Sequence, residues 1–99
     1  IVMPYIWWAN KPAIEDDLAY LGRCLGIGDN FEAVVDWVLT LRSDLGIPND
    51  LAAIGVSEEC VEAIGAKAIN DPSAGGNPIQ FTAGQYTEIC RKAVLGIHG

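Results

Sequence analysis

The sequence predicts an all-α fold, a bundle of about five helices joined by short connections. Apolar residues recur at steps of three and four along most of the chain, which is the spacing of one helix face. No stretch of useful length alternates between apolar and polar residues, as a half-buried strand would. Capping residues precede several of the apolar segments and glycines follow them, which indicates where the helices begin and end.

The first clear helix is expected to begin at Asn10, as its N-cap, with Pro12 in the first turn, where a missing N–H costs nothing. Gly26 and Gly28 end this helix. Residues 1–9 stay open, because their proline and two tryptophans fit several kinds of structure. The apolar positions of the helix that share one face are Ile14, Leu18, Leu21 and Leu25.

A second helix is expected after Asp29 or Asn30, since either side chain is a suitable N-cap. Trp37 lies on its flank, and Gly46 and Pro48 close it. Its buried stripe is expected to comprise Phe31, Val34, Val35, Val38, Leu41 and Leu45.

A short turn over residues 50–54 ends at Gly55, and Ser57 is expected to cap a third, long helix. Glu58 and Glu59 fall in its first turn, where the helix dipole favours negative charge. The residues expected to face inward are Val61, Ile64, Ala68 and Ile69.

Residues 71–78, Asp-Pro-Ser-Ala-Gly-Gly-Asn-Pro, are predicted to form a loop. The last helix has the clearest beginning, because Thr82 and Gln85 have the spacing of a capping box. Phe81 and Tyr86 flank this box as a hydrophobic staple. The inward-facing residues of this helix, and the glycine that ends it, are Ile89, Cys90, Ala93, Val94 and Gly96.

Length and charge exclude several classes of function. With 99 residues, the chain forms one small domain, and 51% hydrophobic against 19% charged residues argues against disorder. Six Lys and Arg against thirteen Asp and Glu give a net charge of −7, which would repel a nucleic-acid backbone or an anionic membrane surface. No apolar run approaches the roughly 18–20 residues that span a bilayer. We therefore expect no nucleic-acid or membrane partner and a cytoplasmic location.

The first residue and the cysteines lead to two further expectations. The chain opens at Ile1 inside an apolar run, which is unusual for a natural N-terminus and indicates a piece of a longer polypeptide. The cysteines, Cys24, Cys60 and Cys90, are odd in number and far apart, and each lies in an apolar helical pattern. They are expected to be reduced core thiols, as in a reducing compartment.

Almost no residue has the spacing that catalysis requires. His98 is the only histidine and is expected to lie in a frayed tail, and no cluster of Cys and His predicts a metal site. Gly75 and Gly76 could cradle a phosphate, but they lack the phosphate-loop spacings and follow no strand, which favours a helix connection. We therefore assign no catalytic residue and no metal ligand to this chain from the residues alone.

An ordered set of short motifs nevertheless resembles one family over essentially the whole chain, the iron-containing (group III) alcohol dehydrogenases, in their C-terminal helical domain. The motifs are Ile-Val-Met-Pro-Tyr from Ile1, Asn-Lys-Pro-Ala from Asn10, Leu-Gly-Ile-Pro from Leu45, Leu-Ala-Ala-Ile-Gly-Val from Leu51, Asp-Pro-Ser-Ala-Gly-Gly-Asn-Pro from Asp71, Thr-Ala from Thr82 and Ala-Val-Leu-Gly from Ala93.

The resemblance implies a parent enzyme of two domains, similar to dehydroquinate synthase. Residues 1–99 would be the C-terminal part of the helical, metal-bearing domain, and the partner would be a dinucleotide-binding domain earlier in the same polypeptide. Such enzymes interconvert alcohols and aldehydes or ketones with NAD or NADP. A divalent iron, held by one aspartate and three histidines, polarises the substrate oxygen. In the family all these ligands precede the segment that begins at Ile1, so none is carried over, and this piece alone is expected to be structural and inactive.

The loop at residues 71–78 is the one segment that the resemblance brings near the chemistry, since in the family it approaches the cleft between the domains. Ser73 is the residue expected to line the cleft, with Gly75 and Asn77 as neighbours that shape the loop. Adjacent glycines also let a backbone approach a ligand closely.

Two other interpretations stay open. A fragment of an enzyme similar to maleylacetate reductase, which works without the metal ligands, would have the same C-terminal helices. A free-standing acidic helical domain could instead bind a protein through an apolar face, for which Trp7 and Trp8 are the candidates. The alcohol, the choice of NAD or NADP, the metal and the oligomeric state, including a homo-oligomer, are left undetermined.

Overall fold

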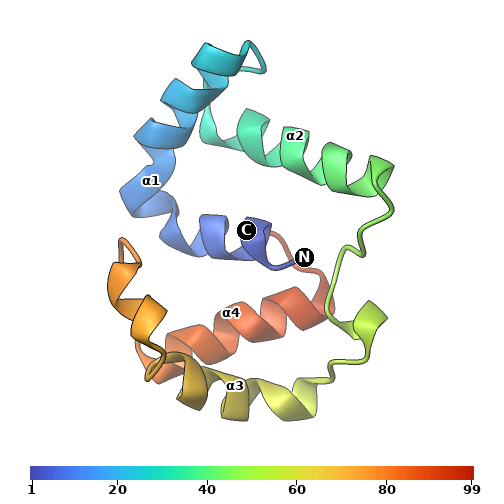
Figure 1. The fold of residues 1–99 in the computed structure, drawn as a ribbon, viewed down its shortest axis with the longest axis vertical. Coiled ribbons are helices and arrows are strands. Elements are labelled where there is room, and N and C mark those ends of the chain that lie inside the picture. The colour runs from blue at the N-terminus through green and yellow to red at the C-terminus, as the bar shows by residue number, and fades with distance from the viewer.

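The computed structural model describes all residues from 1 to 99 and contains helices and no strands (Figure 1). The all-α fold class is therefore confirmed, with four α-helices where about five were expected. The α-helices are α1 (Met3–Leu25), α2 (Phe31–Asp44), α3 (Val61–Ala68) and α4 (Ala83–Leu95). Three short 3₁₀ helices connect them: η1 (Ala52–Ile54), η2 (Glu58–Cys60) and η3 (Pro72–Gly76).

The helices form two hairpins, α1 with α2 and α3 with α4, and each hairpin encloses a small core of its own. Figure 1 shows α4 lying between the N-terminal half of α1 and α3, with both chain ends in the middle of the molecule. The two hairpins touch mainly where α4 meets α1. Each core is small, which leaves much apolar surface on the outside.

Helix α1 begins at Met3, seven residues before the predicted N-cap Asn10. Asn10 is in fact buried in the helix interior, so the cap assignment is wrong. The physical reason is tertiary: Tyr5, only 3% exposed, has packing partners that periodicity over residues 1–9 does not reveal. Pro12 consequently lies inside the helix and offers no N–H to the carbonyl of Trp8, and α1 bends along its length in Figure 1.

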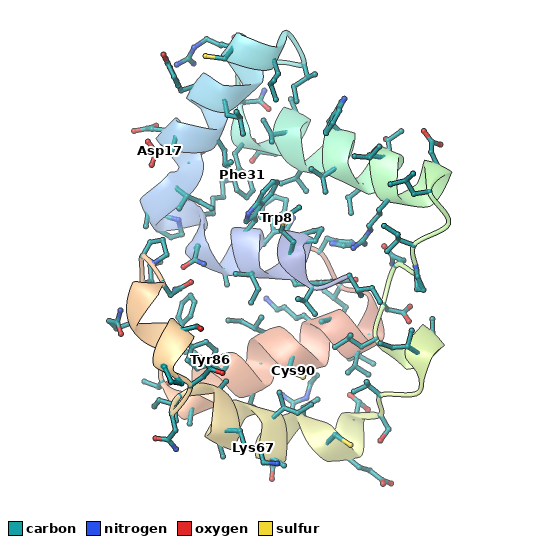
Figure 2. All side chains as sticks on the ribbon, viewed as in Figure 1. Trp8, Asp17, Phe31, Lys67, Tyr86 and Cys90 are labelled. Atoms are coloured by element: carbon teal, nitrogen blue, oxygen red, sulfur yellow. The ribbon has the colours of Figure 1, made fainter.

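The first core lies between α1 and α2. Trp8 and Phe31 meet there edge to face, with ring centroids 4.9 Å apart (Figure 2). The other buried members are Leu18, Val34 and Val35. The predicted stripes are wrong at four positions toward the ends of the two helices, where the side chains are exposed: Leu21, Leu25, Leu41 and Leu45.

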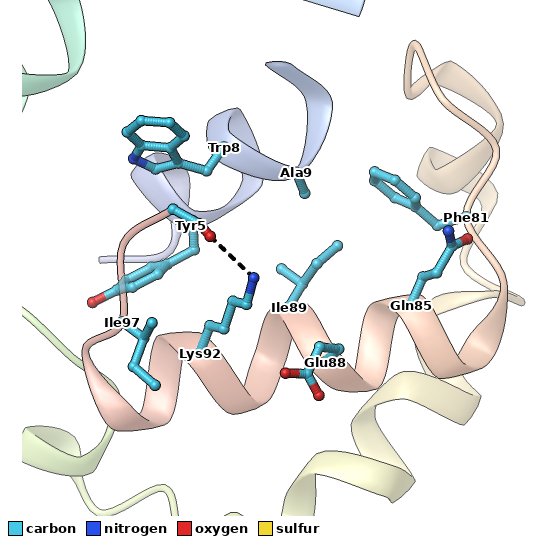
Figure 3. A pocket seen from close by; sticks show the side chains of 10 residues that line it. Tyr5, Trp8, Ala9, Phe81, Gln85, Glu88, Ile89, Lys92 and Ile97 are labelled. Carbon is cyan, nitrogen blue, oxygen red and sulfur yellow. Dashed lines mark hydrogen bonds between the residues drawn. The ribbon is translucent and has the colours of Figure 1, made fainter. Parts of the chain in front are cut away.

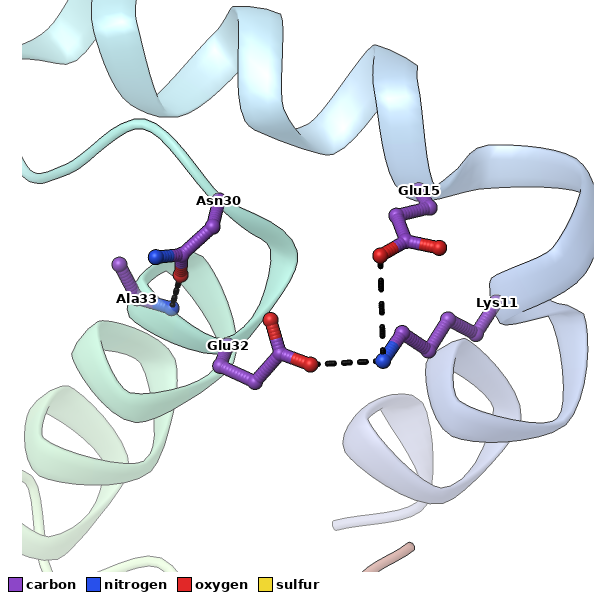
Figure 4. Close-up of polar contacts among 5 residues, drawn as sticks. All are labelled: Lys11, Glu15, Asn30, Glu32 and Ala33. Carbon is purple, nitrogen blue, oxygen red and sulfur yellow. Dashed lines mark hydrogen bonds and ion pairs between the residues drawn. The ribbon is translucent and has the colours of Figure 1, made fainter.

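Polar contacts fix how α2 starts against α1 (Figure 4). Asn30 is the N-cap, and its Oδ1 accepts a hydrogen bond from the backbone N–H of Ala33 at 2.8 Å. Lys11 Nζ lies 2.6 Å from Glu32 Oε1 and 3.9 Å from Glu15 Oε1. The hydrogen bond between Lys11 and Glu32 raises the pKa of the amine and lowers the pKa of the carboxyl.

The second core lies between α3 and α4 and contains Val61, Cys90 and Val94. Helix α3 has only eight residues, because the segment after Ser57 begins as η2, so the expected long helix is wrong. The Ser57 side chain makes no cap hydrogen bond. Ile64 and Ile69 were expected to face inward but are 39% and 44% exposed.

Helix α4 begins as predicted. The N–H of Gln85 donates to Thr82 Oγ1 and the N–H of Thr82 donates to Gln85 Oε1, which completes the capping box. Phe81 and Tyr86 pack edge to face at 5.5 Å, as the staple requires. Gly96 ends the helix in the left-handed conformation, with φ of 73°.

The three cysteines are free thiols, but only Cys90 is buried, and its burial raises its pKa. Cys24 and Cys60 are exposed, so the expectation of three core thiols is wrong for these two. The apolar pattern around each of these two residues does not indicate this exposure.

Candidate functional site

The segment 71–78, predicted as a loop, forms the 3₁₀ turn η3 at its centre. Asp71 caps the turn, with its Oδ1 accepting a hydrogen bond from the N–H of Ser73 at 2.7 Å. Ser73 and Gly75 are exposed and Asn77 is half-buried. The structure therefore presents Ser73 on the surface, with no titratable side chain hydrogen-bonded to its hydroxyl.

The two glycines of this turn leave open space around the backbone. A Cβ added to Gly75 or Gly76 would meet no atom within 4 Å, and neither residue has positive φ. The turn itself thus does not require glycine at these positions. What glycine provides here is a bare backbone surface that a neighbouring group can approach closely.

Asn77 joins this turn to α1. Its side-chain amide and that of Asn10 exchange two hydrogen bonds, Asn10 Nδ2 to Asn77 Oδ1 at 2.9 Å and Asn77 Nδ2 to Asn10 Oδ1 at 2.8 Å. Asn10 is 3% exposed, so the pair is shielded from water on the α1 side. The structure brings together two residues that lie far apart in the sequence.

A cavity of about 200 Å³ lies close to this turn, between α1 and α4 (Figure 3). Tyr5 and Trp8 from α1 and Phe81 before α4 supply aromatic walls, while Glu88 and Lys92 supply charges. Lys92 Nζ donates a hydrogen bond to the carbonyl oxygen of Gly99 at 3.1 Å. The cavity is mixed in character, with both apolar and charged sides.

A cluster of polar side chains lies at the N-terminal end of α1. Arg42, only 6% exposed, donates to the carbonyl oxygens of Ile1 and Asn49 and to Asn49 Oδ1. His98 Nε2 lies 3.2 Å from Asn49 Oδ1, and its ring stacks on Tyr5. The expectation that His98 lies in a frayed tail is therefore wrong, because an aromatic face and a polar acceptor hold the ring.

The ring of His98 is held in conditions that disfavour its charged form. Its Nδ1 atom is buried without a hydrogen-bond partner. Burial, and then the charge of Arg42, lower the pKa of His98 below its ordinary value of 6.5.

No group of three or more His, Cys, Asp or Glu side chains in the chain could hold a metal ion. The residues of this chain therefore do not make up a complete iron site by themselves. Separately, none of the helices combines the length and the apolar character needed to cross a bilayer.

A second hollow is almost entirely apolar. It measures about 360 Å³, and we call it the apolar groove. It runs from the N-terminus of α1 over the α3–α4 hairpin and is lined by Val2, Ile6, Leu51, Val56, Ile64, Ala68, Tyr86, Ile89, Cys90 and Ala93. Trp7 and Trp8, the expected apolar face, are instead half-buried against the first core.

Comparison with known proteins gives the family. Residues 1–94 match the model of the Fe-containing alcohol dehydrogenase family, C-terminal part. The chain belongs to this family. It is also similar to lactaldehyde reductase of Escherichia coli strain K12 and of Escherichia coli O157:H7, each 29% identical over 100 residues. These alignments cover 94% of this chain and 26% of each relative, so the chain spans about a quarter of their length. No solved structure matches it.

Membership of the Fe-containing alcohol dehydrogenase family confirms the resemblance drawn from the sequence motifs. The residues carried over from that resemblance do not form a compact cluster. Ser73 and Gly75 lie on an open turn, and Asn77 alone contacts a distant element, α1.

Sequence reasoning missed Asn10 as a member of this site. An asparagine two residues before a proline has the residue types of a helix N-cap and first turn, which favours the cap assignment. The signal that could have identified it is the apolar run at residues 1–9, which a helix starting at Met3 explains.

Proposed function

We propose that this chain is the C-terminal part of the helical domain of an iron-dependent, NAD(P)-linked alcohol dehydrogenase, which interconverts an alcohol and the corresponding aldehyde or ketone. The observation that carries the proposal is the family match over residues 1–94. The relatives are named lactaldehyde reductases and are about four times as long, which fits a parent with a further, N-terminal domain.

The surface of the chain supports a partner in the same polypeptide. Fourteen large hydrophobic side chains are exposed, and the apolar groove has no charged residue in its lining. An exposed apolar hollow is a common place for another part of a protein to bind. In the proposal the rest of the parent polypeptide covers this surface.

Within the parent, the role proposed for this chain is structural support and one edge of the cleft. Ser73 is proposed to line the cleft, since its side chain is exposed and Gly75 and Gly76 leave the backbone around it open. Asn77 shapes the turn through its hydrogen bonds. Iron, when bound in the parent, would polarise the substrate oxygen as a Lewis acid. Because the residues of this chain form no metal cluster, no step through the metal is assigned to them.

The deciding experiment starts from the coding DNA upstream of the codon for Ile1. An open reading frame that continues into a dinucleotide-binding region is expected. The whole polypeptide, loaded with ferrous iron, should then reduce NAD(P)⁺ when an alcohol is added, measured by the absorbance of NAD(P)H. The 99-residue chain at the same concentration is the control and should be inactive. A reading frame that starts at Ile1, or a whole polypeptide without activity on any short alcohol, would contradict the proposal.

A further inference from the structure

The side-chain amides of Asn10 and Asn77 are oriented by the bonds around them. Asn77 Nδ2 also donates to the carbonyl oxygen of Ile79 at 2.6 Å, which identifies this atom as the nitrogen. Asn77 Oδ1 must then be the acceptor, and Asn10 Nδ2 its donor. The two amides therefore form a reciprocal pair in which each donates to the other.

This amide pair is the one hydrogen-bonded link from residues 71–77, which comprise η3 and its two flanking residues, to a distant part of the chain. Every other hydrogen bond of residues 71–77 reaches at most three residues along the sequence, as Ser73 to Asp71 and Gln80 to Asn77 illustrate. No residue of η3 is buried, so no core packing holds the turn in place. Without the amide pair, the turn would be connected to the rest of the fold chiefly through its two ends.

Asn10 also needs a physical reason for its place in α1. Asparagine is among the weaker helix formers, and a buried amide without partners destabilises a fold. Asn10 is only 3% exposed, so its side-chain amide would be buried without partners if Asn77 did not supply its hydrogen bonds. The two hydrogen bonds with Asn77 therefore explain why an asparagine is buried at this position of α1.

We propose that Asn10 is a positioning residue, which fixes η3 and the exposed Ser73 against α1 through its amide pair with Asn77. The inference deepens the proposed function and rests on it for one consequence, that the pair sets where Ser73 stands at the cleft. The pair itself is testable on the 99-residue chain without reference to any activity.

The substitution Asn10→Asp separates the hydrogen bonds from the shape of the side chain. A protonated carboxyl donates to Asn77 Oδ1 and accepts from Asn77 Nδ2, so it reproduces the pair. An ionised carboxylate only accepts, and it leaves Asn77 Oδ1 facing a second acceptor. Because the position is buried, the pKa of the introduced carboxyl lies above that of a free aspartate. The variant should keep the pair at about pH 5 and lose it at about pH 8.

The measurement is the backbone ¹⁵N order parameters of Ser73–Asn77 in the 99-residue chain. In Asn10→Asp these order parameters should stay at about 0.85 at pH 5 and fall below about 0.6 at pH 8, while those of α2 should not change. Both pH values lie above the pI of about 4.3, which avoids precipitation. The charged side chains of α1, of residues 71–78 and of α4 are present in every variant: Lys11, Glu15, Asp16, Asp17, Arg23, Asp71, Glu88, Arg91 and Lys92.

Asn70→Asp is the matched control, since Asn70 is exposed and its side chain donates only to the carbonyl oxygen of Ala66, four residues back along the chain. It adds the same charge close to η3 and should leave the turn rigid at both pH values. An equally rigid turn in Asn10→Asp at pH 8 would overturn the proposal. Should Asn10→Asp fail to fold, Asn77→Asp at pH 8 removes the same pair from the side of the turn, together with the bond from Asn77 Nδ2 to the carbonyl of Ile79. Loss of order throughout α1 in Asn77→Asp at pH 8 would overturn the proposal too, since the pair would then support the whole fold.

In the whole polypeptide the pair predicts a kinetic signature. Asn10→Asp at about pH 8 should raise KM for the alcohol about tenfold relative to Asn70→Asp, with less effect on KM for the dinucleotide. If η3 becomes flexible but KM for the alcohol is unchanged, the placement of Ser73 at the cleft is contradicted. The positioning of η3 by Asn10 would still be established by the order parameters. The test of how η3 is positioned and the test of where Ser73 lies can therefore fail independently of each other.

Discussion

The imidazole of His98 stacks on the phenol ring of Tyr5, with centroids 4.5 Å apart and planes inclined by 13°. The hydroxyl of Tyr5 donates to the carbonyl of Asn49, and Arg42 donates to the same residue. The contact ties the C-terminal segment to the beginning of α1, and it does so through a ring that can take up a proton.

Stability should therefore fall as the pH drops through the range where His98 titrates. Its pKa is lowered in the folded chain by burial and by Arg42, so protons bind the unfolded state more readily. The stabilisation is fully present above the unfolded pKa of about 6.5 and is lost as the pH falls through the lower, folded value. Urea unfolding at several pH values between about 8 and 5 should show this decline. His98→Phe keeps a ring on Tyr5 and removes the titration, so its decline should be smaller; an identical decline would exclude His98 as the cause.

At Gly65 the backbone of α3 lies close against α4, and an added methyl group has no room. A Cβ there would stand 2.0 Å from Thr87 Oγ1 and 2.8 Å from the Ala83 carbonyl oxygen. Gly65→Ala should lower the free energy of unfolding by about 1–3 kcal/mol. Gly84→Ala is the matched control, because its Cβ would meet only Thr82 Oγ1 at 3.9 Å, and a gain of about 0.4–1 kcal/mol is expected. Chemical denaturation of both variants measures the difference, and equal effects would contradict the close approach.

The apolar groove should bind a hydrophobic fluorescent dye in the isolated chain. Ile64 lines the groove and is 39% exposed. Ile64→Asp should reduce dye fluorescence, because it places a charge in an apolar lining. Tyr20→Asp is the control: Tyr20 is 65% exposed and lies outside the groove, so dye binding should not change. Equal losses in the two variants would mean that the dye binds elsewhere.

Ser73 in the whole enzyme offers a test of the cleft. If Ser73 faces the substrate, Ser73→Phe should penalise bulky alcohols over small ones by roughly 10–200-fold in relative kcat/KM, or about 1–3 kcal/mol. The melting temperature should change little, because Ser73 is exposed and contributes no core packing. Ser43→Phe, on the exposed face of α2, is the control and should leave the selectivity unchanged. An equal loss for small and bulky alcohols would remove Ser73 from the cleft.

The sequence by itself determined the helical class and those helix ends that depend on neighbouring residues. The capping box of Thr82 and Gln85, the Asn30 cap and the left-handed Gly26 and Gly96 are all local, since each is set by hydrogen bonds or backbone freedom within a few residues. The ordered motifs also sufficed to indicate the family.

Only the tertiary structure decided which apolar residues are buried and which partners the polar residues contact. Periodicity places Ile64 and Leu45 on an apolar face, but burial needs a second element packed closely against that face, and Ile64 and Leu45 stay 39% and 66% exposed. Asn10 has the local marks of a cap and His98 those of a frayed end. The partners that bury and bond them, Asn77 and Tyr5, are distant in sequence, and no local pattern records a contact of that kind.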